Sequence, residues 1–359
     1  MLSSTRVRRA AMSLGAKAFW RIPARFTAAR ILGRDYALRC VVFHHIAEAP
    51  SPFTAGISVS ITPRALEAAL QFLSSRYVPV RLEDVLTNGE GRGLPDRAVL
   101  VTFDDAYASV GEYAAPLCRR YHVPAAFFVN AAFVDNRRLA PDNLVCYAVS
   151  MLGMDIINRA IGCVFDNRGP ELHTLAELFG VFFPTITLEQ RTNFLDALCR
   201  LSGINEESLA RDANLYLTSR QLRDLSSPDF EIGNHTYTHT HCRSFSEQDF
   251  ASEIDRNKAE LESMCGARVR SFSQPYGSSR DVTRDVIDHL ERSGHQAVFL
   301  SESVANPRNA DLFHLDRVST SAASDDALFF ELEVLPRIRA IRHKLFTPPG
   351  VAGRAPAAA

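Results

Sequence analysis

Three histidines lie close together in the stretch EIGNHTYTHTH, residues 231–241: His235, His239 and His241. Such a group either binds a metal ion or is a set of solvated side chains on a surface turn. Residues four apart are neighbours on a helical turn, about 6 Å apart at Cβ, but about 13 Å apart on an extended strand. Because a glycine and an asparagine interrupt the strand pattern before them, we expect His235 and His239 to share one helical turn. His241 should then point away from the pair, which on its own is as consistent with surface histidines as with ligands.

Two adjacent acids, Asp104 and Asp105, follow the apolar run at 97–103 directly. Neighbouring carboxylates at the end of a buried strand are costly in desolvation and mutual repulsion unless a cation or hydrogen bonds compensate them. A metal bound by Asp105, with Asp104 beside it, would provide that compensation. The alternative is an acid that caps the helix following the strand.

A third group is the turn SQPYG at 273–277, which also follows a predicted strand. A proline and a glycine around an aromatic residue are common in tight turns. The same turn can direct backbone N–H groups at an oxyanion.

The three groups come together if their strands belong to one parallel sheet, since the carboxyl ends of such strands lie on one face. Two histidines and one aspartate leave an open coordination position for water on a metal ion. A bound metal lowers the pKa of that water, and a free carboxylate can take its proton. The combination therefore predicts a metal-dependent hydrolase.

Alternating strand and helix patterns predict an α/β fold with a parallel sheet. Strands are expected at 37–45, 97–105, 124–133, 229–234, 269–277 and 295–301, and helices at 61–77, 246–266 and 280–294. The region 136–220 interrupts this order with helical patterns, among them 187–203, where Thr187 and Gln190 form a capping box. The pattern fits both a closed or nearly closed barrel and an open doubly wound sheet.

Composition excludes some functions. The chain of 359 residues has a net charge of −1, which gives no support for nucleic-acid binding, and no glycine-rich nucleotide-binding loop follows an early strand. Seven cysteines without a CxxC pair are typical of reduced thiols in a reducing compartment.

The two ends of the chain differ from its middle. Residues 1–36 carry eight basic residues and no acid before Asp35, which is typical of a basic segment that contacts an anionic membrane surface, packs on the domain or forms an arm. The apolar stretches there are too short and too charged for a secretory signal or a membrane span. We expect a barrel at 37–335 and a partly disordered tail at 336–359. The predicted location is cytoplasmic, either free or peripheral to the inner face of the membrane.

TFDDAY (102–107), HTYTH (235–239) and QPYG (274–277) resemble, in that order, the three principal motifs of the polysaccharide deacetylases, the carbohydrate esterase four or NodB-homology family. The resemblance spans roughly residues 37–320. It implies a deformed (β/α) barrel with a helical insertion at 136–220, a divalent metal that is usually zinc, and removal of N-acetyl groups from amino sugars.

By motif position, the resemblance makes Asp104 the catalytic base. It makes Asp105, His235 and His239 the metal ligands, and the N–H of Tyr276 an oxyanion donor. Pro275, Tyr276 and Tyr107 are predicted to contact the substrate.

The chain departs from the family pattern at several positions. Ala106 stands where glycine is usual, and Ser273 where many members have an arginine that orients the base. The tryptophan-bearing motif has no match, since the only tryptophan is Trp20. The catalytic acid, usually a late histidine, has His314 as its candidate by position, with Arg317 close by in sequence. His44 and His45, at the end of the first strand, are alternatives.

The expected function is N-deacetylation of a polysaccharide, oligosaccharide or lipid-linked glycan. A catalytically impaired glycan-binding protein is one alternative, and a related O-acetyl esterase or deformylase is another.

Overall fold

The computed structural model describes residues 36–88, 93–166, 168–308, 310–322 and 324–346. The basic segment predicted for residues 1–36 therefore lies, except for its last residue, outside the described residues. The proposed membrane contact of that segment stays a prediction. None of the described helices is long and apolar enough to cross a bilayer.

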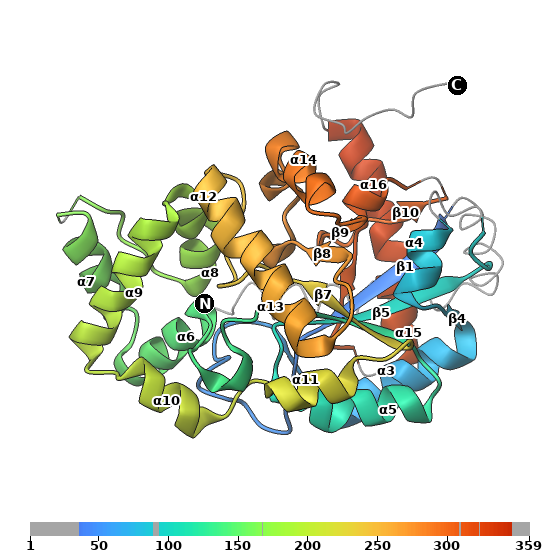
Figure 1. The fold of residues 1–359 in the computed structure, drawn as a ribbon, viewed down its shortest axis with the longest axis horizontal. Coiled ribbons are helices and arrows are strands. Elements are labelled where there is room, and N and C mark those ends of the chain that lie inside the picture. Colours follow the sequence, from blue (N-terminus) through green and yellow to red (C-terminus); the bar gives the residue numbers. More distant parts are fainter. Residues whose placement is uncertain (1–35, 89–92, 167, 309, 323, 347–359) are drawn as a thin grey trace.

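A curled sheet of mainly parallel strands forms the centre of the protein (Figure 1). Its main strands pair in parallel in the order β1 (Tyr36–Phe43), β5 (Ala98–Asp104), β6 (Ala125–Val129), β7 (Phe230–Asn234), β8 (Ser271–Ser273) and β9 (Ala297–Phe299). Short strands extend it: β4 (Val78–Pro79) pairs with β5, and β10 (Asn306–Pro307) runs antiparallel to β1. The pair β2 (His45–Ile46) and β3 (Ser60–Ile61) lies outside this sheet.

Residues 315–319 close the curl between the last and first strands. Leu315 pairs with Phe299 of β9, and the amide of Leu300 donates to the carbonyl of Leu315 at 2.7 Å. Three residues later, β11 (Val318–Ser319) begins and pairs in parallel with β1. This closing segment brings the two edges of the sheet together. It confirms the predicted deformed barrel and rules out an open doubly wound sheet.

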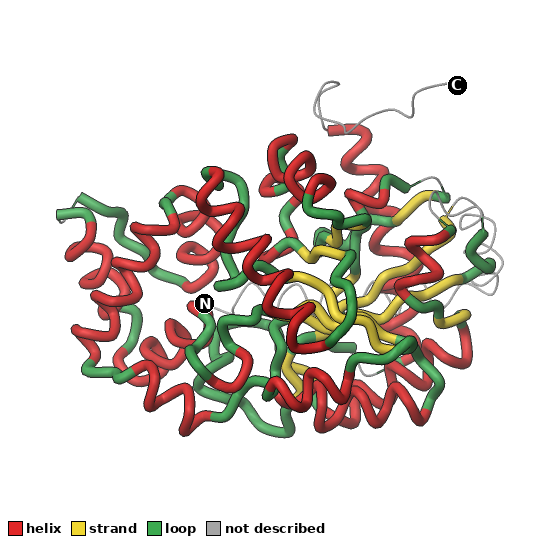
Figure 2. Tube along the Cα trace, viewed as in Figure 1, coloured by secondary structure: helices red, strands yellow, loops and turns green. Residues whose placement is uncertain are grey.

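The strands are apolar on both faces, as expected for a parallel sheet covered by helices. Every residue of β5 and β6 is buried. Helices of the barrel lie around the sheet (Figure 2). They are α3 (Pro63–Arg76), α4 (Leu82–Thr87), η1 (Val110–Ala114) with α5 (Ala115–Arg120), α11 (Ser219–Leu225), α12 (Glu247–Asp249), η5 (Phe250–Asp255), α13 (Arg256–Cys265), α14 (Arg284–Arg292), α15 (Asp325–Phe329), η9 (Phe330–Val334) and α16 (Leu335–Phe346).

The helical insertion forms a lobe beside the barrel, at the left of Figure 1. It contains η2 (Val134–Asn136), α6 (Pro141–Leu152), α7 (Asp155–Val164), α8 (Leu175–Glu177), η3 (Leu178–Phe182), η4 (Phe183–Thr185), α9 (Leu188–Ser202) and α10 (Glu206–Ala213). The predicted capping box is present: the amide of Gln190 donates to Thr187 Oγ1 at 3.1 Å. The lobe has its own apolar core, which includes Leu144, Phe194 and Tyr216.

Two helices near the predicted boundaries carry details that the sequence did not indicate. The helix predicted at 246–266 is present, capped by Ser246 and ended by Gly266, and the π-helical turn η5 lies within it between α12 and α13. The tail predicted at 336–359 begins as a helix, because α16 continues to Phe346. The proline and glycine bias of the sequence starts only after that helix.

Candidate active site

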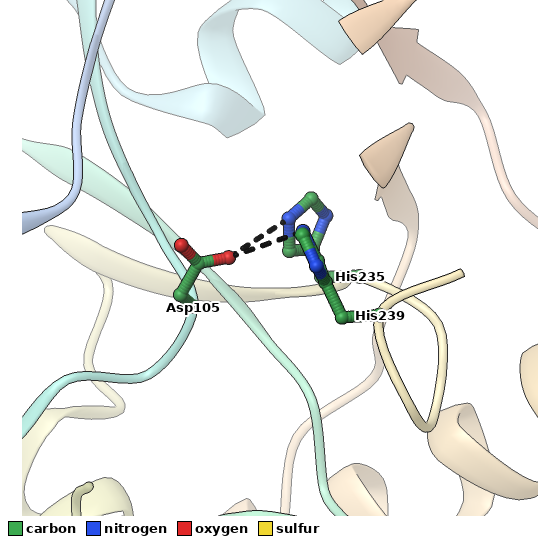
Figure 3. Close-up of side chains that lie close together, drawn as sticks. All are labelled: Asp105, His235 and His239. Carbon is green, nitrogen blue, oxygen red and sulfur yellow. Dashed lines mark ion pairs between the residues drawn. The ribbon is translucent and has the colours of Figure 1, made fainter. Parts of the chain in front are cut away.

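Asp105, His235 and His239 converge at the carboxyl ends of β5 and β7 (Figure 3). Asp105 Oδ1 lies 3.3 Å from His235 Nε2 and 3.5 Å from His239 Nε2. Donor atoms bound to one tetrahedral zinc ion at about 2.0–2.2 Å lie about 3.3–3.5 Å from one another. Asp105 Oδ1 is buried and has no hydrogen-bond partner among the described residues, so it can accept a cation. These three residues therefore fit a divalent metal ion, and no other such group occurs in the described part of the chain.

The loop that carries the two histidines is irregular, so the predicted helical turn was wrong. Thr236 and His239 adopt left-handed backbone angles, with φ of 59° and 52°. Buried asparagines hold this path: Asn130 Nδ2 donates to the carbonyls of His235 and Thr236, and Asn234 Oδ1 accepts from the amide of Thr236. The imidazoles still meet, with ring centres 5.0 Å apart, because the loop folds back on itself.

The other nitrogen of each ring lies next to an oxygen, through a hydrogen bond in His235 and at ion-pair distance in His239. His235 Nδ1 donates to the carbonyl of Ser273 at 2.7 Å, and His239 Nδ1 lies 2.6 Å from Asp142 Oδ2. Oxygen partners at Nδ1 leave Nε2 of each ring available as a metal ligand, the arrangement that second-shell groups commonly impose.

Asp104 is held by Arg317, a residue of the closing segment. The guanidinium donates from Nη1 to Oδ1 at 2.8 Å and from Nη2 to Oδ2 at 2.7 Å, and both side chains are almost fully buried. Nη2 also donates to Ser273 Oγ at 2.7 Å. Burial alone would raise the pKa of Asp104, but Arg317 and the nearby imidazoles outweigh burial and lower it. Arg317 thus replaces, from the closing segment, the arginine that is missing at position 273.

His44, rather than His314, lies at the site. Its Nε2 is 4.0 Å from Asp104 Oδ2, and its side chain is 20% exposed. His314 lies in η8 (Leu312–His314), and its ring contacts Asp311 at 3.1 Å without reaching any of the metal-site side chains described. His45 faces elsewhere, with its Nδ1 3.0 Å from Ser60 Oγ. Burial lowers the pKa of His44, and the carboxylates of Asp105 and Asp104 partly offset this.

The turn after β8 places Tyr276 beside the metal ligands. Tyr276 has a left-handed backbone, with φ of 62°, and its ring centre lies 4.7 Å from that of His239. His241 is outside the ligand set, as expected, but it is not a surface residue. Its ring stacks on Tyr276 at 4.1 Å, and its Nδ1 contacts the buried Asp281 at 2.7 Å. His241 therefore supports the turn that was predicted to bind the oxyanion.

The remaining predicted substrate contacts are buried. Tyr107 is only 2% exposed, and its hydroxyl lies between groups of the insertion, accepting from Asn143 Nδ2 at 2.9 Å. Its ring stacks on Tyr216. The ring packs where the insertion meets the barrel, so its position adds no support for a substrate contact, and that role of Tyr107 stays a prediction. Pro275 is also buried and shapes the turn, whereas Tyr276 is partly exposed.

Three residues that complete the site were not identified from sequence: Arg317 as partner of the base, and Asp142 and Arg191 from the insertion. Asp142 lies in the first turn of a helix, where an acid is common for reasons unrelated to catalysis. Arg317 was noted only for its closeness to His314, and 213 residues separate it from Asp104. No local pattern links such distant positions.

Comparison with known proteins agrees with this geometry. The sequence profile of the polysaccharide deacetylase family matches residues 91–178 and 181–298, more than half of the chain. No curated protein sequence is significantly similar.

Solved structures share the fold at low identity. The deacetylase PplD of Streptococcus pyogenes, solved in complex with acetate, has a TM-score of 0.55 at 14% identity, covering 83% of this chain and 99% of that one. IcaB from Ammonifex degensii has a TM-score of 0.51 at 18% identity, covering 83% and 98%. A polysaccharide deacetylase from Bacillus cereus has a TM-score of 0.53 at 13% identity, covering 83% and 69%. With the profile match over most of the barrel, these findings establish that the chain belongs to the polysaccharide deacetylase family of carbohydrate N-deacetylases.

Proposed function

We propose that the protein is a metal-dependent hydrolase that removes N-acetyl groups from amino sugars of a polysaccharide, an oligosaccharide or a lipid-linked glycan. The observation that carries the proposal is the convergence of Asp105, His235 and His239 beside the arginine-bound Asp104. The oxygen Oδ1 of Asp105, which has no hydrogen-bond partner, and the Nε2 atoms of the two histidines form the donor set of a catalytic zinc ion.

Each polar group around the metal ligands has a distinct part in amide hydrolysis. A divalent cation, most simply Zn²⁺, would supply Lewis acidity at the acetyl group and a more acidic water. Asp104 takes the proton of the attacking water, and Arg317 keeps this carboxylate ionised and oriented. The backbone N–H of Tyr276 donates to the acetyl oxygen as negative charge develops there. His44, whose Nε2 lies 4.0 Å from Asp104 Oδ2, gives a proton to the leaving nitrogen.

A non-catalytic glycan-binding protein was favoured by the serine at position 273 and by the lack of a clear catalytic acid. The geometry of the site argues against both reasons. The arginine absent at position 273 is replaced by Arg317, and a histidine for the acid is present at position 44. An O-acetyl esterase would use the same groups, so the choice between ester and amide depends on the substrate test.

The decisive experiment measures metal content and acetate release on the purified full chain. We expect about one zinc ion per chain and release of acetate from N-acetylated amino-sugar oligomers. Asp105→Ala and His239→Ala should abolish both metal binding and acetate release. Full activity of either variant after chelator treatment would refute the metal site. Release of acetate from O-acetyl but not from N-acetyl substrates would identify an esterase instead.

The proposed location is cytoplasmic, with the basic segment at 1–36 on the inner face of the membrane. Cosedimentation of the full chain with vesicles containing anionic lipid, compared with neutral vesicles, tests this. Equal sedimentation with both would contradict an electrostatic contact.

A further inference from the structure

We propose that the helical insertion completes the metal centre, with Asp142 and Arg191 as positioning residues that fix His239 and thereby set the affinity for the metal. The inference rests on the metal-dependent site proposed above. The inference gives the insertion, residues 136–220, the role of supporting His239, which the three sequence motifs of the barrel do not account for.

Asp142 holds the ring of His239 from the first turn of α6. Its Oδ2 lies 2.6 Å from His239 Nδ1, and its Oδ1 accepts the hydroxyl of Tyr276 at 2.9 Å. One buried carboxylate therefore joins a metal ligand to the turn that binds the oxyanion. A carboxylate at Nδ1 orients the imidazole and makes Nε2 more basic toward the metal.

The start of α6 is itself fixed, so Asp142 cannot easily follow a moving histidine. The amide of Ala140 donates to the hydroxyl of Tyr216 at 2.8 Å. The neighbouring Asn143 is fully buried and donates to the carbonyl of Phe53 at 2.8 Å. Pro141 stands at the first position of the helix, where its fixed φ suits the helix start. These contacts tie the carboxylate to the packed core of the insertion.

Arg191 holds the backbone of the same ligand from α9. This side chain is 5% exposed, and its Nη1 donates to the carbonyl of His239 at 2.9 Å while Nη2 donates to Thr238 Oγ1 at 2.5 Å. Thr238 is also bound by Glu253 of η5, which belongs to the barrel. A left-handed backbone such as that of His239 persists only where surrounding contacts fix it, and Arg191 supplies such a contact.

The other histidine ligand is supported by the barrel alone. His235 Nδ1 donates to the carbonyl of Ser273 in β8, and its own carbonyl accepts from Asn130, which follows β6. The two histidines therefore depend on different parts of the fold. Substitutions of Asp142 and Arg191 should therefore affect the metal site through His239.

The test compares zinc affinities of full-length variants by competition with a chromophoric chelator. We expect Asp142→Asn and Asp142→Ala to weaken zinc binding by about 10–100-fold, the usual effect of losing such a partner. Arg191→Met should weaken it several-fold. The matched control is Asp155→Asn, the same change at an exposed aspartate in the first turn of α7, and it should bind zinc like the wild type.

Two readouts separate positioning from general damage to the fold. Thermal unfolding of the metal-free proteins should show that Asp142→Asn remains folded, and the visible spectrum of the cobalt-loaded variant should differ from that of the wild type because the ligand geometry has changed. Tyr276→Phe removes only the second partner of Asp142, and it should leave the zinc affinity within about twofold of the wild-type value. A loss of zinc affinity in Tyr276→Phe equal to that in Asp142→Ala would overturn the direct role at His239.

Wild-type zinc affinity in both Asp142 variants would overturn the inference outright. Failure of the wild type to bind zinc would overturn it together with the metal-dependent function. A wild type that binds zinc but releases no acetate would refute only the proposed function, because the dependence of zinc affinity on Asp142 is measured without substrate.

Discussion

Asp104 is a charged group that the protein keeps almost completely away from water. Arg317 donates a hydrogen bond to each of its two carboxylate oxygens, and the hydroxyl of Ser273 donates another to Oδ2. Removing one partner of such a buried pair leaves an uncompensated charge and costs about 3–5 kcal/mol. The same arginine therefore contributes to stability and to the protonation state of the base.

Exchange of the arginine tests this double role. Arg317→Met should reduce deacetylation by about 10²-fold or more, since an unpaired Asp104 becomes protonated or misplaced. The double variant Arg317→Met with Ser273→Arg restores an arginine at the position usual in the family, and at least a tenfold recovery of activity is expected. Steady-state kinetics and urea unfolding of both variants provide the measurement. No recovery in a folded double variant would contradict the equivalence of the two positions.

The identity of the proton donor is a second prediction at this scale. His44→Ala should lower the turnover number by about 10²–10⁴-fold, the usual contribution of a general acid, while zinc affinity stays near the wild-type value. His314→Ala should retain wild-type activity, because that ring contacts Asp311 away from the metal ligands. Reversed results for the two variants would show that sequence position, and not the observed geometry, identifies the acid.

At the scale of elements, the turn at 275–277 depends on Gly277. Its φ is 67°, and a Cβ there would lie 2.4 Å from the Cβ of Ser301 and 2.7 Å from its backbone nitrogen. That nitrogen donates to the carbonyl of Gly277 at 3.0 Å, so the two strand ends approach closely because the glycine has no side chain. The turn cannot move away without displacing Tyr276.

Gly277→Ala should therefore destabilise the protein by about 2–4 kcal/mol, combining the left-handed backbone with the overlap at Ser301. Gly203→Ala is the matched control, since Gly203 has a left-handed backbone, with a φ of 71° and a ψ of 13°, and no atom within 4 Å of an added Cβ. It should cost only about 1–2 kcal/mol. Chemical denaturation measures both changes, and acetate release should fall in the first variant alone. Equal losses of stability would mean that the contact with Ser301 is unimportant.

Elements with strong local signals were predicted from sequence. The helix α3 was expected from Thr62 and Pro63, and α9 from its capping box, because these signals act within a few residues. The π-turn η5 and the irregular histidine loop have no such signal. Their backbone paths depend on partners far away in sequence, such as Asn130 for the loop. Prediction therefore succeeded where the structure is determined locally.

The residues of the site also fall into those with a local sequence signal and those that depend on distant parts of the chain. Asp105, His235 and His239 belong to short motifs, were predicted together as ligands, and lie together in the structure. Arg317, Asp142 and Arg191 act across the fold, and only the arrangement of the strands and the insertion brings them to the motifs. Tyr107 lies within a motif, yet its burial against the insertion could not be inferred from the motif itself.

For the whole molecule, the stability should depend on pH through Asp316, which lies in the closing segment. Burial raises the pKa of Asp316 from its ordinary value to about 7, and the charge of Arg317 lowers it only slightly. The unfolded chain ionises this group near pH 4, so the folded state binds an extra proton between about pH 4 and 7. Stability therefore falls as pH rises through this range.

Asp316→Asn removes the group that titrates. The variant should gain roughly 2 kcal/mol of stability relative to the wild type on going from pH 5 to pH 8. Urea unfolding at both pH values measures the change, with Asp155→Asn as a control that should show no such gain. A wild type and an Asp316→Asn variant with parallel pH dependence would mean that Asp316 is ionised in the folded protein.

The closing segment also fixes when, during synthesis, the active site can form. A ribosome adds Asp104 first and Arg317 only 213 residues later, after the insertion and the last of the main strands. Until then the base has no guanidinium partner, and the first and last strands have nothing to join them. The nascent chain thus receives its catalytic charge pairing and its barrel closure in one late event. A polypeptide released before that point has the three principal motifs, but its Asp104 lacks the guanidinium that pairs with it in the folded protein.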